Sequence, residues 1–218
     1  MTVSDNQNNS ILSLFPLYAS YKDMVTKEVA GLTDAQLDWT SNRWSWSRWS
    51  IRNNVSHVAS HLFRWYILRW KGTLFPYGPP ITNEEAHYLA GLPHRQLDHN
   101  RWWNIDHILA KLDQGLEMVR DIISRETAES LKEKSITLRE PGFYLQIADR
   151  YPGTLLQDPN EPSIWLLTLE GNLHHSEGEM ITHLYNVQRI KNAQGLKEQV
   201  PLPQIGYWTL PNWDRSEA

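Results

Sequence analysis

The chain has 218 residues, a net charge of −4 and no cysteine. This length suits one domain with a sizeable core. Its mixed charge gives no basic groove for nucleic acid and no polybasic patch for a membrane surface, and no apolar run is long enough to span a bilayer. The lack of cysteine excludes disulfides, a thiolate nucleophile and cysteine metal sites. Residues 1–10 lack the order of a signal peptide, so we expect a cytoplasmic protein.

Two apolar stripes at helical spacing predict the first long helices. The first helix is expected over residues 14–30, with Pro16 tolerated in its first turn. A capping box over residues 33–36 then predicts a short helical turn. The second helix is expected over residues 51–70, with Ser50 as its N-cap.

Two more long helices are predicted further along the chain. Residues 105–124 have clean helical periodicity. Residues 163–195 follow a proline-containing segment and end at a glycine, which predicts a fourth helix. Gly171 and Gly178 weaken it locally and predict close approach of a partner helix or a ligand.

The remaining segments are long connections and a tail. Residues 72–103 are too many for a simple turn between helices, and the sequence does not say whether they form a lid. The connection over residues 127–161 contains a strand-like piece at 135–138. Residues 196–218 are rich in aromatics, so we expect this tail to pack on the helices.

Five of the nine histidines fall in two short windows, one in the second predicted helix and one in the fourth. His175, Glu179 and His183 follow one another at steps of four, which places them on one helical stripe. His57 and His61 repeat the same step. Imidazole and carboxylate are the usual ligands of zinc, iron and nickel in a site without sulfur. Three such ligands would leave a coordination position open, which is the catalytic arrangement.

The same spacing also has a purely structural interpretation. Histidines four residues apart are common on half-buried stripes, and Glu179 could be only an ion-pair partner of His175 or His183. Spacing alone does not decide between this interpretation and metal binding.

The surrounding residues carry a resemblance to a family. Residues 49–57 resemble the second-helix signature of the DinB-like (YfiT-like) family, in which a Trp-Ser/Thr start precedes a metal-binding histidine. The fourth helix resembles that family's His-x-x-x-His motif, with His183 as its last histidine, residues 185–187 in place of Gly-Gln-Ile, and Gly195 as the closing glycine. Residues 104–113 resemble the start of the family's third helix.

The resemblance covers residues 11–195 and implies a fold and a cofactor. It implies an all-α, antiparallel four-helix bundle with long inter-helix loops and a divalent metal, nickel or zinc, held by three histidines at one end. Residues 1–10 would then be a flexible N-terminus and residues 196–218 the packed tail. Many members of the family are dimers, which implies a homodimer here, and its characterised members include thiol-dependent transferases.

By this resemblance the metal ligands are His57, His183 and Glu179, where Glu179 replaces the family's earlier histidine. If the register is off by one turn, His61 or His175 becomes a ligand instead. Two histidines and one carboxylate also suit a non-haem iron site, so nickel or zinc is expected and iron stays possible.

The function implied is that of a metal-dependent transferase or hydrolase. The metal would activate a water or a thiol cosubstrate against a small-molecule substrate, with His175 or Glu177 as candidate general base. Tryptophans such as Trp46, Trp65 and Trp165 could line an apolar pocket, although ordinary core packing explains each one better when it is taken alone. The alternative function is a non-catalytic metal- or ligand-binding stress protein on the same fold. A third hypothesis is a non-haem iron oxygenase.

Overall fold

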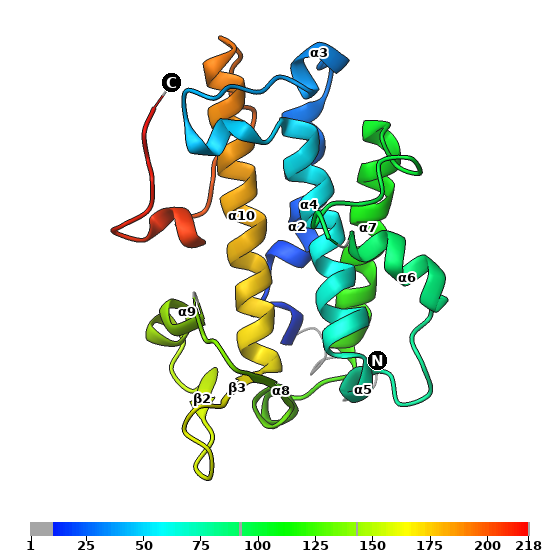
Figure 1. Cartoon of the computed structure of the whole chain (residues 1–218), viewed down its shortest axis with the longest axis vertical. Helices are drawn as coiled ribbons and strands as arrows, with labels where there is room; N and C mark the ends of the chain where they lie inside the picture. Colours follow the sequence, from blue (N-terminus) through cyan, green and yellow to red (C-terminus); the bar gives the residue numbers. More distant parts are fainter. Residues whose placement is uncertain (1–10, 92, 143, 218) are drawn as a thin grey trace.

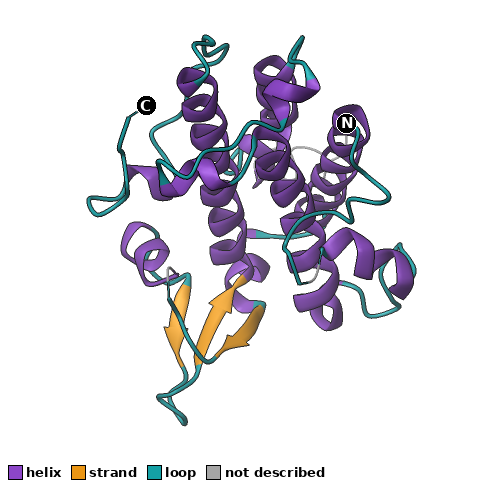
Figure 2. Cartoon of the chain, turned by 45° about the horizontal axis from the view of Figure 1, so that its top comes forward, coloured by secondary structure: helices purple, strands orange, loops and turns teal. Residues whose placement is uncertain are grey.

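The computed structural model describes residues 11–91, 93–142 and 144–217. Most of this part is helical, with a small three-stranded sheet at one end (Figures 1 and 2). The α-helices are α2 (Leu17–Val29), α3 (Asp34–Leu37), α4 (Ile51–Phe63), α5 (Lys71–Leu74), α6 (Asn83–Ala90), α7 (Ile105–Ser124), α8 (Ala128–Glu133), α9 (Tyr144–Arg150) and α10 (Leu169–Ala193). The strands are β1 (Ser135–Leu138), β2 (Leu155–Gln157) and β3 (Trp165–Thr168).

The four longest helices of the described chain are α2, α4, α7 and α10, and they pack against one another (Figure 1). The periodic stripe over residues 105–124 predicts α7 correctly, because its apolar residues face one shared core. Pro16 is the N-cap residue of α2 rather than part of its first turn. The four helices bring α4 and α10, which carry both histidine windows, into contact.

Side-chain caps fix where two of the predicted helical segments begin. Ser50 accepts a hydrogen bond from the backbone N–H of Asn53 at 3.1 Å, and the Asn53 side chain accepts from the N–H of Ser50. The same reciprocal capping box joins Thr33 and Gln36 at the start of α3. Both boxes satisfy N–H groups that a helix start leaves without partners, so both capping predictions are confirmed.

The helix that begins at Ile51 changes its winding before it ends. After α4 the chain continues as a π-helix, η2 (Arg64–Arg69), so the predicted helix reaches Trp70 only with this wider turn. Such bulges are often found at functional sites. Trp65, at the start of η2, lies beside the histidines of α4 and α10.

The predicted start of the fourth helix at Ser163 is wrong. Residues Trp165–Thr168 form β3, the central strand of an antiparallel sheet in the order β1-β3-β2 (Figure 2), and α10 begins at Leu169. Thr168 decides this boundary, because its side chain accepts from the N–H of Gly171 as the N-cap of α10. The sheet also qualifies the all-α class, whereas the strand predicted at residues 135–138 is confirmed as β1.

The connections and the tail contain structure of their own. The long connection over residues 72–103 contains α6, and the one over residues 127–161 contains α8, α9 and β2 in addition to β1. Tyr207 of the tail is buried, with its short 3-10 turn η3 (Tyr207–Thr209) on α10. Residues 1–10, predicted to be flexible, lie outside the described residues. In the part that is described, no helix has both the length and the apolar character needed to cross a bilayer.

Candidate metal centre

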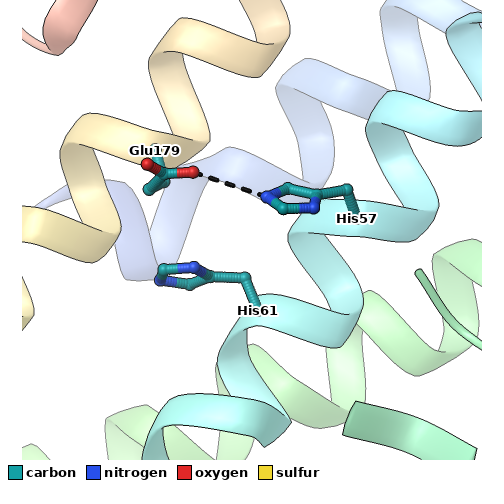
Figure 3. Close-up of side chains that lie close together, drawn as sticks. All are labelled: His57, His61 and Glu179. Carbon is teal, nitrogen blue, oxygen red and sulfur yellow. Dashed lines mark hydrogen bonds and ion pairs between the residues drawn. The ribbon is translucent and has the colours of Figure 1, made fainter. Parts of the chain in front are cut away.

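Two helices bring three potential metal ligands together. His57 and His61 extend from α4 and Glu179 from α10, and one ligand atom of each lies within 4.8 Å of the other two (Figure 3). Both histidines are buried, whereas the Glu179 side chain remains 22% exposed. Two imidazoles and a carboxylate are a donor set that suits zinc, nickel or iron.

A third imidazole contacts the same carboxylate. Nε2 of His183 and Nε2 of His57 each lie 3.4 Å from Oε2 of Glu179. The rings of His57 and His183 have their centroids 4.4 Å apart. The step of four between Glu179 and His183 therefore brings them together as its helical spacing predicts, and His57 meets them from α4.

The hydrogen bond on the far side of the His57 ring sets its tautomer. Nδ1 of His57 lies 2.8 Å from the backbone carbonyl of Arg95, which can only accept, so we place the proton on Nδ1. Nε2 of the neutral ring then presents a lone pair to Glu179. Arg95 has a φ of 59°, a left-handed conformation that is costly for a residue with a Cβ and is typical of functional sites.

The His183 ring is oriented in the same way by Asn54. Nδ1 of His183 lies 2.7 Å from Oδ1 of Asn54, and Nδ2 of Asn54 donates to the carbonyl of Ser50 at 2.8 Å. The bond to Ser50 fixes which end of the amide faces the histidine. Asn54 therefore accepts from Nδ1, and Nε2 of His183 presents its lone pair to Glu179.

A chain of hydroxyl groups sets the tautomer of His61. The Tyr18 hydroxyl donates to the Leu173 carbonyl at 3.0 Å and lies 3.1 Å from the Tyr66 hydroxyl. Oγ of Ser176 lies 3.3 Å from the Tyr66 hydroxyl and 3.0 Å from Nε2 of His61. Each hydroxyl has one proton, so donation runs from His61 towards Leu173. Nε2 of His61 is then the donor, and its lone pair is on Nδ1.

Burial determines the charge states of the two histidines of α4. Burial lowers the pKa of His57 to about 4, with His183 adding to the effect, and burial lowers the pKa of His61 well below its usual value. At neutral pH His57 and His61 are therefore neutral beside the carboxyl group of Glu179.

This arrangement offers a site for a cation. In the tautomers set by Arg95 and Asn54, lone pairs of His57 and His183 face Oε2 of Glu179, and a cation or a proton between them would satisfy all three groups. Metal-binding histidines usually donate a hydrogen bond from their other ring nitrogen to a carbonyl or a similar acceptor. The backbone carbonyl of Arg95 and Oδ1 of Asn54 are such acceptors here. The residues present therefore fit a divalent cation.

His175 lies next to the centre but has both ring nitrogens engaged. Nδ1 bonds the Tyr207 hydroxyl, and Nε2 lies 3.4 Å from the Tyr144 hydroxyl. Its ring is 5.1 Å from that of His61, and burial lowers its pKa to about 4. These two tyrosine contacts occupy both ring nitrogens of His175 in this structure.

Glu177, the other candidate base, faces away from the centre. Its Oε1 accepts from the backbone N–H of Leu17 at 3.3 Å, and its Oε2 lies 3.5 Å from Nδ1 of His174. Two residues along a helix turn the side chain by about 200°, so Glu177 and Glu179 extend from opposite sides of α10. A base role for either His175 or Glu177 stays a prediction.

Tryptophan contacts with the centre differ from those expected. Trp49 packs against His57 and His183, with ring centroids 5.0 and 5.9 Å away. Trp65 packs against His61, as a residue lining the site would, whereas Trp46 stacks on Trp44 elsewhere.

The residues that orient the imidazoles were missed by sequence reasoning. Asn54 lies one turn before His57 and Ser176 one turn before Glu179, so a search for polar residues one turn away could have found both. The contact from Arg95 is made by a backbone carbonyl, which no residue type signals.

A comparison of the chain with models of known families, with curated proteins and with solved structures found no match. The resemblance to the DinB-like family therefore stays a prediction.

Proposed function

We propose that this protein is a divalent-metal-dependent enzyme whose metal is held by Glu179, His57 and a further histidine, either His183 or His61. The observation that carries this proposal is the convergence of oriented imidazole lone pairs on the partly exposed carboxylate of Glu179. Nickel and zinc suit this donor set best, and iron fits it as well. We also propose that the protein belongs to the DinB-like family and has that family's antiparallel four-helix bundle.

A bound divalent ion lowers the pKa of a coordinated water or thiol, or polarises an electrophile, so that attack proceeds at neutral pH. The protein's own residues bind and orient. Arg95 and Asn54 hold two imidazoles in a fixed tautomer, and Trp49 covers two of the rings. Glu179 is more exposed than His57, so a small-molecule substrate approaches from the side of the carboxylate.

The chain has no cysteine, so a thiol must come from a cosubstrate. The reaction is then a transfer to that thiol or a hydrolysis by water. We include a homodimer and a cytoplasmic location in the proposal, both from the family resemblance and the composition.

A second function has one observation in its favour. His57 is 4% and His61 1% exposed, which suits a closed site that stores or senses a metal without turning over a substrate. The non-catalytic binding protein is therefore the alternative.

Metal analysis tests the site itself. Untagged protein, purified without added metal and then reconstituted, should contain close to one equivalent of nickel, zinc or iron by plasma mass spectrometry. His57→Ala and Glu179→Ala should lose it, whereas His107→Ala, at an exposed position, should keep it. Equal metal content in all four proteins would refute the site.

Cobalt substitution distinguishes the enzyme from the binding protein. In the Co²⁺-loaded protein, 2-mercaptoethanol should add a thiolate-to-cobalt charge-transfer band and change the d–d spectrum if a coordination position is open. A spectrum that responds neither to the thiol nor to pH would show a saturated metal, and the non-catalytic function would replace the enzyme.

A further inference from the structure

A cavity lies on the opposite side of α10 from the metal centre. It has a volume of about 430 Å³ and is enclosed by α9, the first half of α10 and tail residues 205–212. In Figure 1, α9 and the tail lie on the same side of α10. The volume is in the range of small-molecule sites, about 300–1,000 Å³.

A buried carboxylate lines this cavity. The Glu177 side chain is only 6% exposed. Its one hydrogen bond in the described chain is the 3.3 Å contact from the N–H of Leu17, and its ion-pair partner there is His174 at 3.5 Å. No lysine or arginine of the described residues pairs with Glu177, although a buried carboxylate is stable only with a partner.

The neighbouring His174 side chain has no hydrogen bond at Nδ1. This buried atom has no hydrogen-bond partner among the described residues, and it lies 3.5 Å from Oε2 of Glu177. The ring is held by Tyr151, which stacks on it with centroids 3.6 Å apart and an interplanar angle of 4°. A buried polar atom without a partner is rare in folded proteins and calls for an explanation such as a ligand.

The rest of the lining is largely apolar and aromatic. Ile147, Tyr151, Tyr207 and Leu210 line the cavity together with Gly178. Asp149 and Arg150 are exposed at its edge, and their opposite charges offset each other. The buried Glu177 therefore determines the sign of charge that the interior accepts.

We propose that this cavity binds a small organic cation, an ammonium group on an apolar or aromatic body. The ammonium group pairs with Glu177, and the body lies against Tyr151 and Tyr207, where aromatic faces also attract cations. The site does not depend on the metal centre, because Glu177 and Glu179 face opposite sides of α10. Tyr207 touches both sites, since its hydroxyl bonds His175.

Isothermal titration calorimetry with phenethylamine at pH 7 tests this proposal, because the amine is then protonated. Phenethyl alcohol and 3-phenylpropionate are its neutral and anionic counterparts of similar size. Phenethylamine should bind saturably, the alcohol at least about tenfold more weakly, and the anion not at all. Equal affinity of the amine and the alcohol, or no saturable binding of the amine, would overturn the proposal.

Glu177→Gln keeps the shape of the side chain and its contact with Leu17, and should weaken amine binding about tenfold while leaving alcohol binding unchanged. Glu170→Gln, on the same helix but outside the cavity, is the matched control and should change neither. If Glu177→Gln does not fold, Leu210→Trp should fill the cavity and abolish amine binding. Unchanged amine affinity in the folded variant contradicts the proposal. Metal content measured on the same samples shows separately whether the metal centre exists.

Discussion

Asn54 and Ser176 each orient one imidazole at the metal centre, Asn54 from α4 and Ser176 from α10. Asn54 accepts from His183, and Ser176 accepts from His61. Either His183 or His61 can complete a metal site with Glu179 and His57. Substitution of Asn54 or Ser176 therefore tests which of these two histidines binds the metal, without removing a ligand.

Replacing Asn54 with leucine removes the acceptor of His183 while keeping the buried volume similar. If His183 is a ligand, metal affinity should fall about 10- to 100-fold, because its ring loses its fixed tautomer. Competition with a chromophoric chelator measures this change. Asn192→Ala, at an exposed position of α10, should leave affinity unchanged. An Asn54→Leu protein with wild-type affinity would exclude His183 as a ligand.

Replacing Ser176 with alanine is the corresponding test for His61. The variant breaks the hydroxyl chain to Tyr66 at the atom that contacts Nε2 of His61. A loss of about 10- to 100-fold in metal affinity is expected if His61 coordinates through Nδ1. A loss in only one of the two variants assigns the third ligand, and no loss in either would leave both histidines outside the metal's coordination.

The helical step of four was enough to predict which residues share a stripe, but not which of their nitrogens are free. His175 belongs to the same stripe as Glu179 and His183, yet Tyr144 and Tyr207 engage both of its nitrogens. Those tyrosines come from α9 and from the tail, whose positions depend on tertiary packing. Sequence spacing therefore predicts a cluster and leaves its chemistry open.

At the scale of elements, the boundary between β3 and α10 depends on one side chain. Thr168 is buried; its Oγ1 accepts from the N–H of Gly171 at 3.1 Å and donates to the carbonyl of Thr154 at 3.1 Å. The same residue therefore caps the helix and ties it to the segment before β2.

Thr168→Ala should destabilise the protein by about 1–2 kcal/mol, because it removes the N-cap of the longest described helix. The Thr154 carbonyl would also lose a buried donor. Urea unfolding followed by circular dichroism gives the change in the free energy of unfolding. Thr26→Ala, on the exposed side of α2, should stay within about 0.5 kcal/mol of the wild type. A Thr168→Ala protein as stable as Thr26→Ala would show that the cap does not set this boundary.

The same boundary explains why the fourth helix was predicted to begin too early. Residues 164–167 are an apolar run that fits a buried strand or a buried helix, and periodicity alone cannot separate the two. By contrast, residues 105–124 alternate apolar and polar faces over many turns, so α7 was predicted correctly. The winding change at Arg64–Arg69 has no residue signal such as proline or glycine.

At the scale of the whole molecule, the tail is tied to the helices by a buried ion pair. Glu28 of α2 pairs with Lys191 of α10 and accepts from the N–H groups of Gln199 and Val200. Burial raises the pKa of Glu28, but its hydrogen bonds with Lys191 and Gln188 outweigh burial and lower it. This carboxylate therefore stabilises the fold above its unfolded pKa, and the contribution is lost as the pH falls through the folded pKa.

Buried histidines also make the free energy of unfolding depend on pH, in a higher pH range than Glu28 does. His57 and His175 have folded pKa values of about 4, against about 6.5 in an unfolded chain, and the pKa of His61 is also lowered. Between these values the unfolded chain binds more protons than the folded protein. The free energy of unfolding must therefore fall as the pH decreases from about 6.5 towards 4, by up to about 1.4 kcal/mol per pH unit for each histidine.

Urea unfolding of the metal-free protein at pH 7, 6 and 5, with chelator present, measures this slope. His57→Gln lacks one of the titrating groups, so its stability should depend less steeply on pH, whereas His107→Ala should follow the wild type because its side chain is exposed. Zinc should steepen the dependence, since a metal binds the neutral imidazoles and competes with protons. Stability that is flat or rises between pH 7 and pH 5 would mean that these histidines are protonated in the folded protein. A proton rather than a metal would then lie between His57 and Glu179.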